Sequence, residues 1–260
     1  MAERQAKERQ EQPDELREEH QPEQVRERLE NSENVSYLDD AILGAIDGCI
    51  TTFAVVSGAV GGGFGGVVVV VLGLASLLAD GFSMGVSNYL GVKSREERVE
   101  QARAVERRQI EQIPDGEREE IRQIYARKGF EGETLEKIVD TITADEELWI
   151  DTMVREELNM HQAEETPLRS GGATFAAFLI VGLIPLAPFL MPQLDAQTAF
   201  WVSAVVTGIA FFAVGVGKGY VLDRSWLRSG IETLLTGGGA AVLAYFIGRW
   251  VRSAYGASIA

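Results

Sequence analysis

The sequence contains five nearly uncharged apolar segments, each about 20 residues or longer, and these constrain the fold more than any other feature. At 1.5 Å per residue, a helix of about 20 residues crosses the ~30 Å hydrocarbon core of a bilayer. A buried helix of a soluble protein would be shorter and apolar on one side only. We therefore predict an all-α membrane protein with five transmembrane helices. The segments cover residues 38–60, 67–92, 171–191, 198–220 and 231–251.

The charged residues lie almost entirely outside these segments. The net charge is −15, and the acidic excess falls in residues 1–40 and 94–169. Such acidity excludes nucleic acid as a partner, because phosphate binding needs a basic surface. A single cysteine, Cys49, excludes a disulfide framework. The predicted organisation is a charged N-terminal arm (1–37), transmembrane helices one and two (38–93), a helical insert (94–169) and transmembrane helices three to five (170–260).

The basic residues predict the orientation in the membrane. By the positive-inside rule, the N-terminus, the insert and the loop at 221–229 face the cytoplasm. The glycine-rich turn at 61–66 and the loop at 192–197 then face outwards, as does the C-terminus, where Arg249 and Arg252 weakly oppose the rule. The N-terminus lacks the apolar core of a signal peptide. Together with the acidic composition, this favours a prokaryotic cell membrane.

The insert has the pattern of a helical domain. The second apolar segment continues as a charged helix to about Gln112, where Pro114-Asp115-Gly116 interrupts it. Asp115 is the predicted N-cap of a helix that ends near Lys128. Two further helices are predicted at 134–142 and 145–160. The last has a narrow apolar face that partner helices or a second subunit must cover.

The third apolar segment contains two prolines, Pro185 and Pro188. Each removes a backbone donor, so a kink is predicted there. Such a kink is tolerated where a neighbouring helix or a water-lined cavity satisfies the freed carbonyl groups, or it is a harmless kink near the outer end.

Asp47 and Asp80 each lie within an apolar segment. A carboxylate at membrane depth costs about 2.5–3.5 kcal/mol on insertion scales and commonly marks an ion path. Asp80, Met84 and Asn88 follow one another at four-residue intervals, so they share a helix face. Carboxylate with thioether favours Fe²⁺, Mn²⁺, Co²⁺ or Zn²⁺ over Mg²⁺ or Ca²⁺. The alternatives are that Met84 only packs against neighbouring helices and that the aspartates are structural, with hydrogen bonds to Thr51 or Asn88.

The insert contains a second group of possible metal ligands on its predicted helices. Two pairs, at spacings of three and four residues, each share a helix face. Taken alone, this spacing is better explained by a solvated acidic face on so acidic a chain. The residues are Glu106, Glu117, Glu120, Met153 and Glu157.

Several short motifs accompany these residues. Gly44-Ala45-Ile46-Asp47-Gly48 and the following Thr51, Phe53, Ala54 and Gly58 resemble the first-span signature of the vacuolar iron transporter family. The order of spans and insert is similar to that family's layout. The further matching motifs are Ser83-Met84-Gly85, Tyr89-Leu90, Lys93-Ser94, residues 182–188 and Lys218-Gly219-Tyr220.

This resemblance implies a homodimer that exports Fe²⁺ from the cytoplasm in exchange for protons. It places Asp47 and Met84 in a translocation site at the dimer interface, with Asp80 and Asn88 as our additional candidates. It also implies that the insert is a cytoplasmic metal-binding domain, with Glu106, Glu117, Glu120, Met153 and Glu157 as its ligands.

The chain departs from the family pattern at three positions. A further insert glutamate falls on Gln109, and a second methionine falls on Val154. A glutamate of the second span falls on Ser76, and Asp80 lies one turn later on the same face. We expect Asp80 to substitute for the missing acid.

Three functions fit these features. The leading one is proton-coupled export of Fe²⁺, and Mn²⁺ or a broader range of divalent ions is the alternative within the same class. The third is a membrane-anchored metal sensor or store, which would not need acids inside its spans. An enzyme is not expected, since there is no P-loop, no nucleophile elbow and only two histidines. No organic cofactor is expected.

Overall fold

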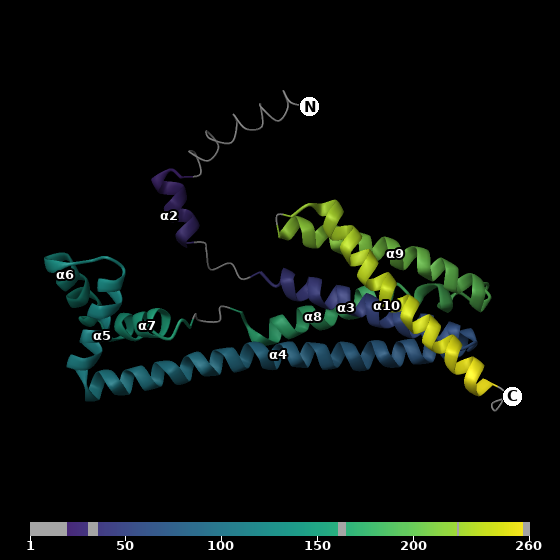
Figure 1. Ribbon diagram of the computed structural model, residues 1–260, viewed down its shortest axis with the longest axis horizontal. Helices are drawn as coiled ribbons and strands as arrows, with labels where there is room; N and C mark the ends of the chain where they lie inside the picture. The colour runs from purple at the N-terminus through teal and green to yellow at the C-terminus, as the bar shows by residue number, and fades with distance from the viewer. Residues whose placement is uncertain (1–19, 31–35, 161–164, 223, 257–260) are drawn as a thin grey trace, which may run out of the picture. The chain divides into compact units, whose positions relative to one another are not determined.

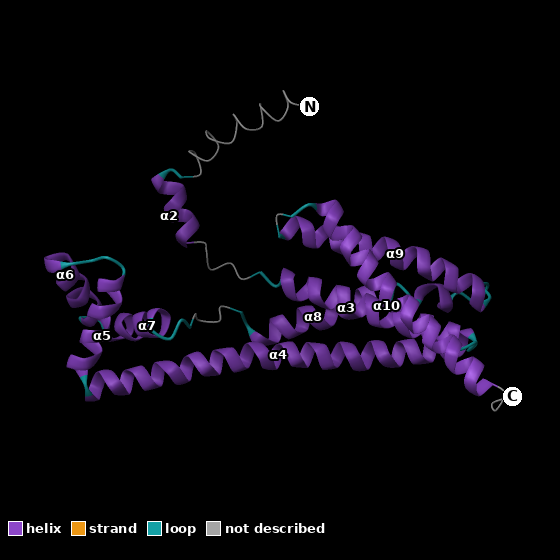
Figure 2. Cartoon of the chain, in the orientation of Figure 1, coloured by secondary structure: helices purple, strands orange, loops and turns teal. Residues whose placement is uncertain are grey.

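The computed structural model describes residues 20–30, 36–160, 165–222 and 224–256, and every regular element in those ranges is helical (Figure 2). The chain divides into two compact units, residues 1–36 and 37–260. In the first unit, the structure describes helix α2 (Pro22–Glu30). The rest of the predicted arm, residues 1–19 and 31–35, lies outside the described residues.

Four of the described helices are long and apolar enough to cross a membrane (Figure 1). Their bounds agree with the first, second, fourth and fifth predicted segments to within about five residues. The one large extension is at the end of the second helix, which continues far beyond its apolar part, as predicted. The four are α3 (Leu38–Gly61), α4 (Gly66–Gln112), α9 (Ala196–Val221) and α10 (Trp226–Tyr255).

The third predicted segment is broken where a kink was expected. Helix α8 (Pro167–Gly182) ends before Pro185, and a short 3-10 helix, η1 (Ala187–Leu190), follows it. With 16 residues, α8 is about 24 Å long, less than the hydrocarbon thickness. The Ser203 hydroxyl on α9 donates a 2.6 Å hydrogen bond to the Pro185 carbonyl oxygen, so a neighbouring helix satisfies a group that the break exposes.

Glycines bring the backbone of α3 against two neighbouring helices. A Cβ at Gly48 would lie 2.4 Å from the Phe178 carbonyl oxygen on α8. A Cβ at Gly61 would lie 2.3 Å from the Tyr245 carbonyl oxygen on α10. Only glycine allows such close contact, so these positions fix how α3 packs.

Helix α4 has 47 residues, about 70 Å of continuous helix, and joins the apolar helices to the insert. The insert adds three helices, α5 (Pro114–Arg127), α6 (Gly132–Thr143) and α7 (Glu146–Glu156). Two predictions here were wrong. Asp115 lies inside the first turn of α5, because Pro114 already occupies the first helical position and Ile113 is the N-cap. Helix α7 ends at Glu156, four residues early.

The insert has an apolar core of its own. Val139 on α6 and Ile150 on α7 are fully buried, as is Ile121 on α5. The end of α4 contributes Val99 and Ile110. Helices of the same insert therefore cover the middle of the narrow apolar face of α7, whereas Leu148 near its start and Leu158 just after its end stay exposed.

Candidate functional site

The structure brings the two intramembrane aspartates together. Asp47 on α3 is half-buried, Asp80 on α4 is exposed, and their carboxylates are close enough to repel each other. The Ser76 hydroxyl donates a 2.5 Å hydrogen bond to Oδ2 of Asp80. The Thr51 hydroxyl bonds to the Asp47 backbone carbonyl, at 2.8 Å, and not to its carboxylate. Within the described residues, no basic side chain pairs with either aspartate.

Met84 lies one turn beyond Asp80 on α4. It is half-buried and packs against the apolar core formed with α3 and α8. Since four residues separate Met84 from Asp80, the thioether and the carboxylate lie on the same face of α4.

Asn88 lies in a polar network that joins three helices. Its side-chain amide donates to the Asp40 carboxylate at 2.7 Å and to the Thr174 hydroxyl at 2.8 Å. The Ser170 hydroxyl donates to the other oxygen of Asp40. Asn88 therefore holds Asp40, rather than Asp47 or Asp80.

The sequence analysis did not single out Asp40. It precedes Asp47 by seven residues, two helical turns, so the two acids lie on one face of α3. That spacing is the signal that would have found it.

In the insert, two of the predicted glutamates are buried beside the apolar core. Glu106 on α4 and Glu117 on α5 are 3% and 1% exposed, and Met153 on α7 is fully buried. One oxygen of Glu106 and both oxygens of Glu117 have no hydrogen-bond partner. Glu120 and Glu157 lie at the surface. A solvated acidic face therefore does not describe Glu106 and Glu117.

Burial and neighbouring negative charge raise the pKa values of three of these glutamates. Burial, with repulsion from three neighbouring glutamates, raises the pKa of Glu106 to about 7. Burial, with repulsion from Glu120 and Glu157, raises the pKa of Glu117 to about 6. The pKa of Glu157 is raised by burial and by repulsion from Glu120. Such mutual repulsion places these four carboxylates in one neighbourhood.

The basic residues of the insert pair with other acids. Arg103 and Arg107 on α4 each reach Glu147 of α7 at 2.5 Å. Arg122 on α5 reaches Glu136 of α6 at 2.8 Å. None of the ion pairs in the described part of the chain includes Glu106, Glu117, Glu120 or Glu157. The peripheral pairs join the helices, and the negative charge of the four glutamates stays uncompensated.

This arrangement can attract a cation, because buried unpaired carboxylates gain free energy from any positive charge that reaches them. Across the residues that the structure describes, no three carboxylate, imidazole or thiolate groups already form a metal-ion site. Ion binding in the insert would therefore require side-chain rotation toward a shared centre.

The comparisons with known proteins identify the family of the chain. The model of the VIT family matches residues 38–249. The vacuolar iron transporter of Toxoplasma gondii is 31% identical over 241 residues, which cover 88% of this chain and 80% of the relative. Vacuolar iron transporter 1 of Arabidopsis thaliana is 31% identical, with 82% and 85% covered, and that of Eucalyptus grandis is 29% identical, with 82% and 86% covered.

These relatives are named as transporters, in accord with the expectation that the chain is not an enzyme. They come from eukaryotes, so they give no support to the expected prokaryotic membrane, whereas the apolar helices indicate an integral membrane protein. Since the family model covers most of the sequence, from the first apolar helix nearly to the end of the last, the chain belongs to the VIT family.

Proposed function

We propose that this protein exports Fe²⁺ from the cytoplasm in exchange for protons. The observation that carries the proposal is a pair of carboxylates on two apolar helices, Asp47 on α3 and Asp80 on α4, near enough to repel and with no described basic partner. The names of the relatives supply the metal. A divalent cation between the two carboxylates replaces their repulsion with attraction to a shared charge.

The exposure of Asp80 supports a homodimer. In a single copy, this carboxylate lies on the surface of an apolar helix, beside the exposed Leu78 and Phe82. Contact with lipid would be costly, so a second copy covering this face of α4 is favoured. Two copies of Asp47 and Met84 then supply four ligands to one ion, with Asp80 adding carboxylate oxygen. Water or backbone carbonyls complete the shell.

The same proposal includes a fifth transmembrane segment made of α8 and η1. Together they cover residues 167–190, which is long enough to cross the membrane although the helix is interrupted. With five segments, the positive-inside rule puts the N-terminus and the insert in the cytoplasm.

The insert is proposed to collect metal for the path. Its unpaired glutamates attract divalent ions, and Met153 adds a thioether that favours Fe²⁺ over Ca²⁺. The ligands are Glu106, Glu117, Glu120, Met153 and Glu157. Helix α4 joins this cluster directly to Asp80 and Met84.

Proton exchange follows from competition. A carboxylate binds either a proton or the metal strongly, so acid on the far side of the membrane weakens the hold of Asp47 and Asp80 on the ion. Release of metal there is coupled to uptake of protons. Export of Mn²⁺ is the second candidate, because the same oxygen and sulfur ligands bind it.

The test is metal flux in proteoliposomes loaded with a metal-sensitive dye and a pH-sensitive dye. Asp47→Ala is expected to abolish both Fe²⁺ movement and metal-dependent proton movement. Glu232→Gln is the matched control, since it removes an exposed acid from α10, a helix that carries neither aspartate, and Glu232 is not among the charges that act on Asp47. Full flux in Asp47→Ala would exclude the proposed path. Metal binding without flux in the unaltered protein would instead indicate a membrane-anchored sensor or store.

A further inference from the structure

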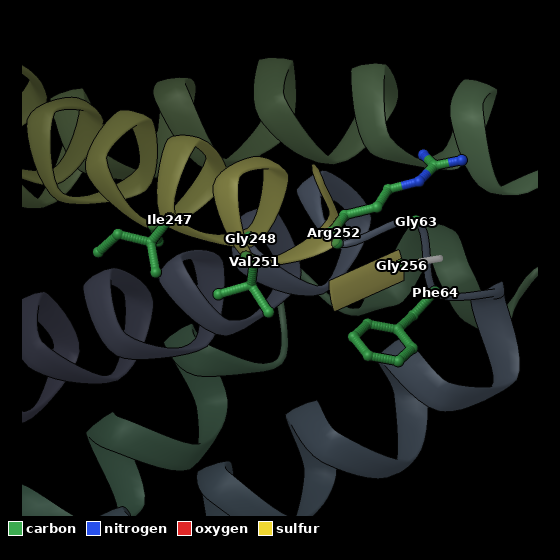
Figure 3. A pocket seen from close by; sticks show the side chains of 10 residues that line it. Gly63, Phe64, Ile247, Gly248, Val251, Arg252 and Gly256 are labelled. Carbon is green, nitrogen blue, oxygen red and sulfur yellow. The ribbon is translucent and has the colours of Figure 1, made fainter. Parts of the chain in front are cut away.

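A cavity of about 650 Å³ lies between the end of α10 and the turn that joins α3 to α4 (Figure 3). Its origin is the glycine contact between α3 and α10. A Cβ at Gly248 would lie 2.1 Å from the Gly58 carbonyl oxygen, so the two helices touch there. Helix α3 ends at Gly61, whereas α10 continues to Tyr255. The cavity is lined by this last stretch of α10 and by the turn that follows α3.

The cavity is apolar inside and basic at its edge. Phe64, Ile247 and Val251 form apolar walls and are 52%, 62% and 41% exposed. The Arg252 guanidinium lies over Gly63, where a Cβ would come within 2.7 Å of its nitrogen. Gly63 has a φ of 80°, a conformation that favours glycine, so this turn has room for the arginine. In the described part of the chain, no acid pairs with Arg252.

Two aromatic residues indicate the depth of this site in the membrane. Trp250 and Tyr255, on the same end of α10, are 64% and 57% exposed. Exposed tryptophan and tyrosine at the end of an apolar helix are typical of the lipid headgroup level. Arg252 therefore lies where lipid phosphates are found, and the apolar walls lie next to it.

We propose that this cavity binds an anionic phospholipid. The phosphate accepts hydrogen bonds from the Arg252 guanidinium, whose planar donors suit two phosphate oxygens. An acyl chain fills the space between Phe64, Ile247 and Val251. An anionic headgroup is preferred because it has no cation of its own to compete with the guanidinium. The binding requires neither metal nor transport, so it is independent of the proposed function.

Charge and shape together exclude simpler occupants. Free phosphate would leave the apolar walls in contact with water. An uncharged hydrocarbon would leave Arg252 unpaired. A lipid matches both features, because it joins a phosphate to an apolar chain, and Arg252 and the apolar side chains line the same cavity.

The test uses the full-length protein in detergent, with lipid binding followed by native mass spectrometry and by thermal unfolding. Phosphatidylglycerol is expected to bind and to raise the unfolding temperature more than phosphatidylcholine does. Arg252→Gln is expected to weaken phosphatidylglycerol binding about tenfold, the value of a charge-assisted hydrogen bond. Arg249→Gln is the matched control, since it lies one turn away, is exposed and does not line the cavity. It should change binding by less than about twofold.

A second variant tests the apolar walls. Val251→Trp fills the cavity and keeps Arg252, so it should lose the lipid while the unfolding temperature without lipid stays unchanged. The proposal is overturned if Arg249→Gln weakens binding as much as Arg252→Gln, because that indicates general charge attraction. It is also overturned if inorganic phosphate or phosphatidylcholine protects as well as phosphatidylglycerol, or if Val251→Trp binds normally.

Discussion

The carboxylates of the membrane helices and those of the insert are unpaired in different ways. Asp47 on α3 and Asp80 on α4 are near enough for their charges to repel, Asp47 is half-buried and Asp80 is exposed. Glu106 and Glu117 are buried beside a compact apolar core, with oxygens that have no partner. In both regions, repulsion between unpaired carboxylates is unfavourable. Only in the insert are such carboxylates almost completely buried.

This difference teaches what each region needs in order to bind a cation. In the insert, the surrounding helices already bury Glu106, Glu117 and Met153, so an ion would neutralise buried charge once the side chains rotate toward a shared centre. In the membrane, the Asp80 side of the pair is exposed, which is why the proposed function includes a second copy that covers it.

The largest effect is expected from removing and then relocating the membrane carboxylate. Asp80→Ala should lower Fe²⁺ flux in proteoliposomes by about tenfold or more, because a charged ligand is lost. Adding Ser76→Glu in the same chain should restore much of it, since residues 76 and 80 lie one turn apart on one face of α4. Failure of Ser76→Glu to restore flux in a dimer that still assembles would show that the Asp80 position itself is required.

The second effect is a pH dependence of the insert. The pKa of Glu106 is raised from 4.5 to about 7, so the metal-free folded protein keeps a proton that the unfolded chain has lost. Unfolding then releases a proton, and the metal-free protein loses stability as pH rises from about 4.5 to about 7. Metal has to displace that proton, so its affinity should increase over the same range.

Glu106→Gln sharpens this prediction. The amide cannot ionise, so the unfolding temperature of the metal-free protein should depend less on pH, and metal should bind about tenfold more weakly at pH 7. The control is Glu111→Gln, an exposed acid on the same helix. Thermal unfolding and calorimetric titration with Mn²⁺ measure both effects. Identical pH profiles for Glu106→Gln and the unaltered protein would contradict the burial argument.

Much of the fold could be predicted because length and hydropathy are local properties. Four long helices begin and end within about five residues of the predicted apolar segments, apart from the cytoplasmic extension of α4, which the charge pattern also predicted. The break after Gly182 could not be predicted, because it depends on Ser203, a residue of another helix, satisfying the Pro185 carbonyl. A proline pair alone does not distinguish a kink from a break.

The candidate sites were predicted less completely. Asp47 was found because a charge inside an apolar segment is conspicuous, whereas the partner of Asn88 was not, because Asp40 lies at the helix end where acids are common. The burial of Glu106 had a signal, since Val99, Ala102 and Ile110 place it on the core face of α4. This apolar spacing is a weak signal here, because glutamates are so frequent in the insert that one of them falls on an apolar face by chance.

The smallest effect is expected when the Met153 thioether is replaced. This substitution distinguishes a role in core packing from a role in metal binding. Leucine has nearly the same volume, so Met153→Leu should lower the free energy of unfolding by less than about 1.5 kcal/mol in metal-free protein. If the thioether is a ligand, the variant should nevertheless lose part of its preference for Fe²⁺ over Ca²⁺, because only oxygen donors remain. Competition titration under anaerobic conditions measures that preference. An unchanged preference would show that Met153 only fills the core, and the insert would then discriminate among metals by charge alone, as an oxygen-lined site does.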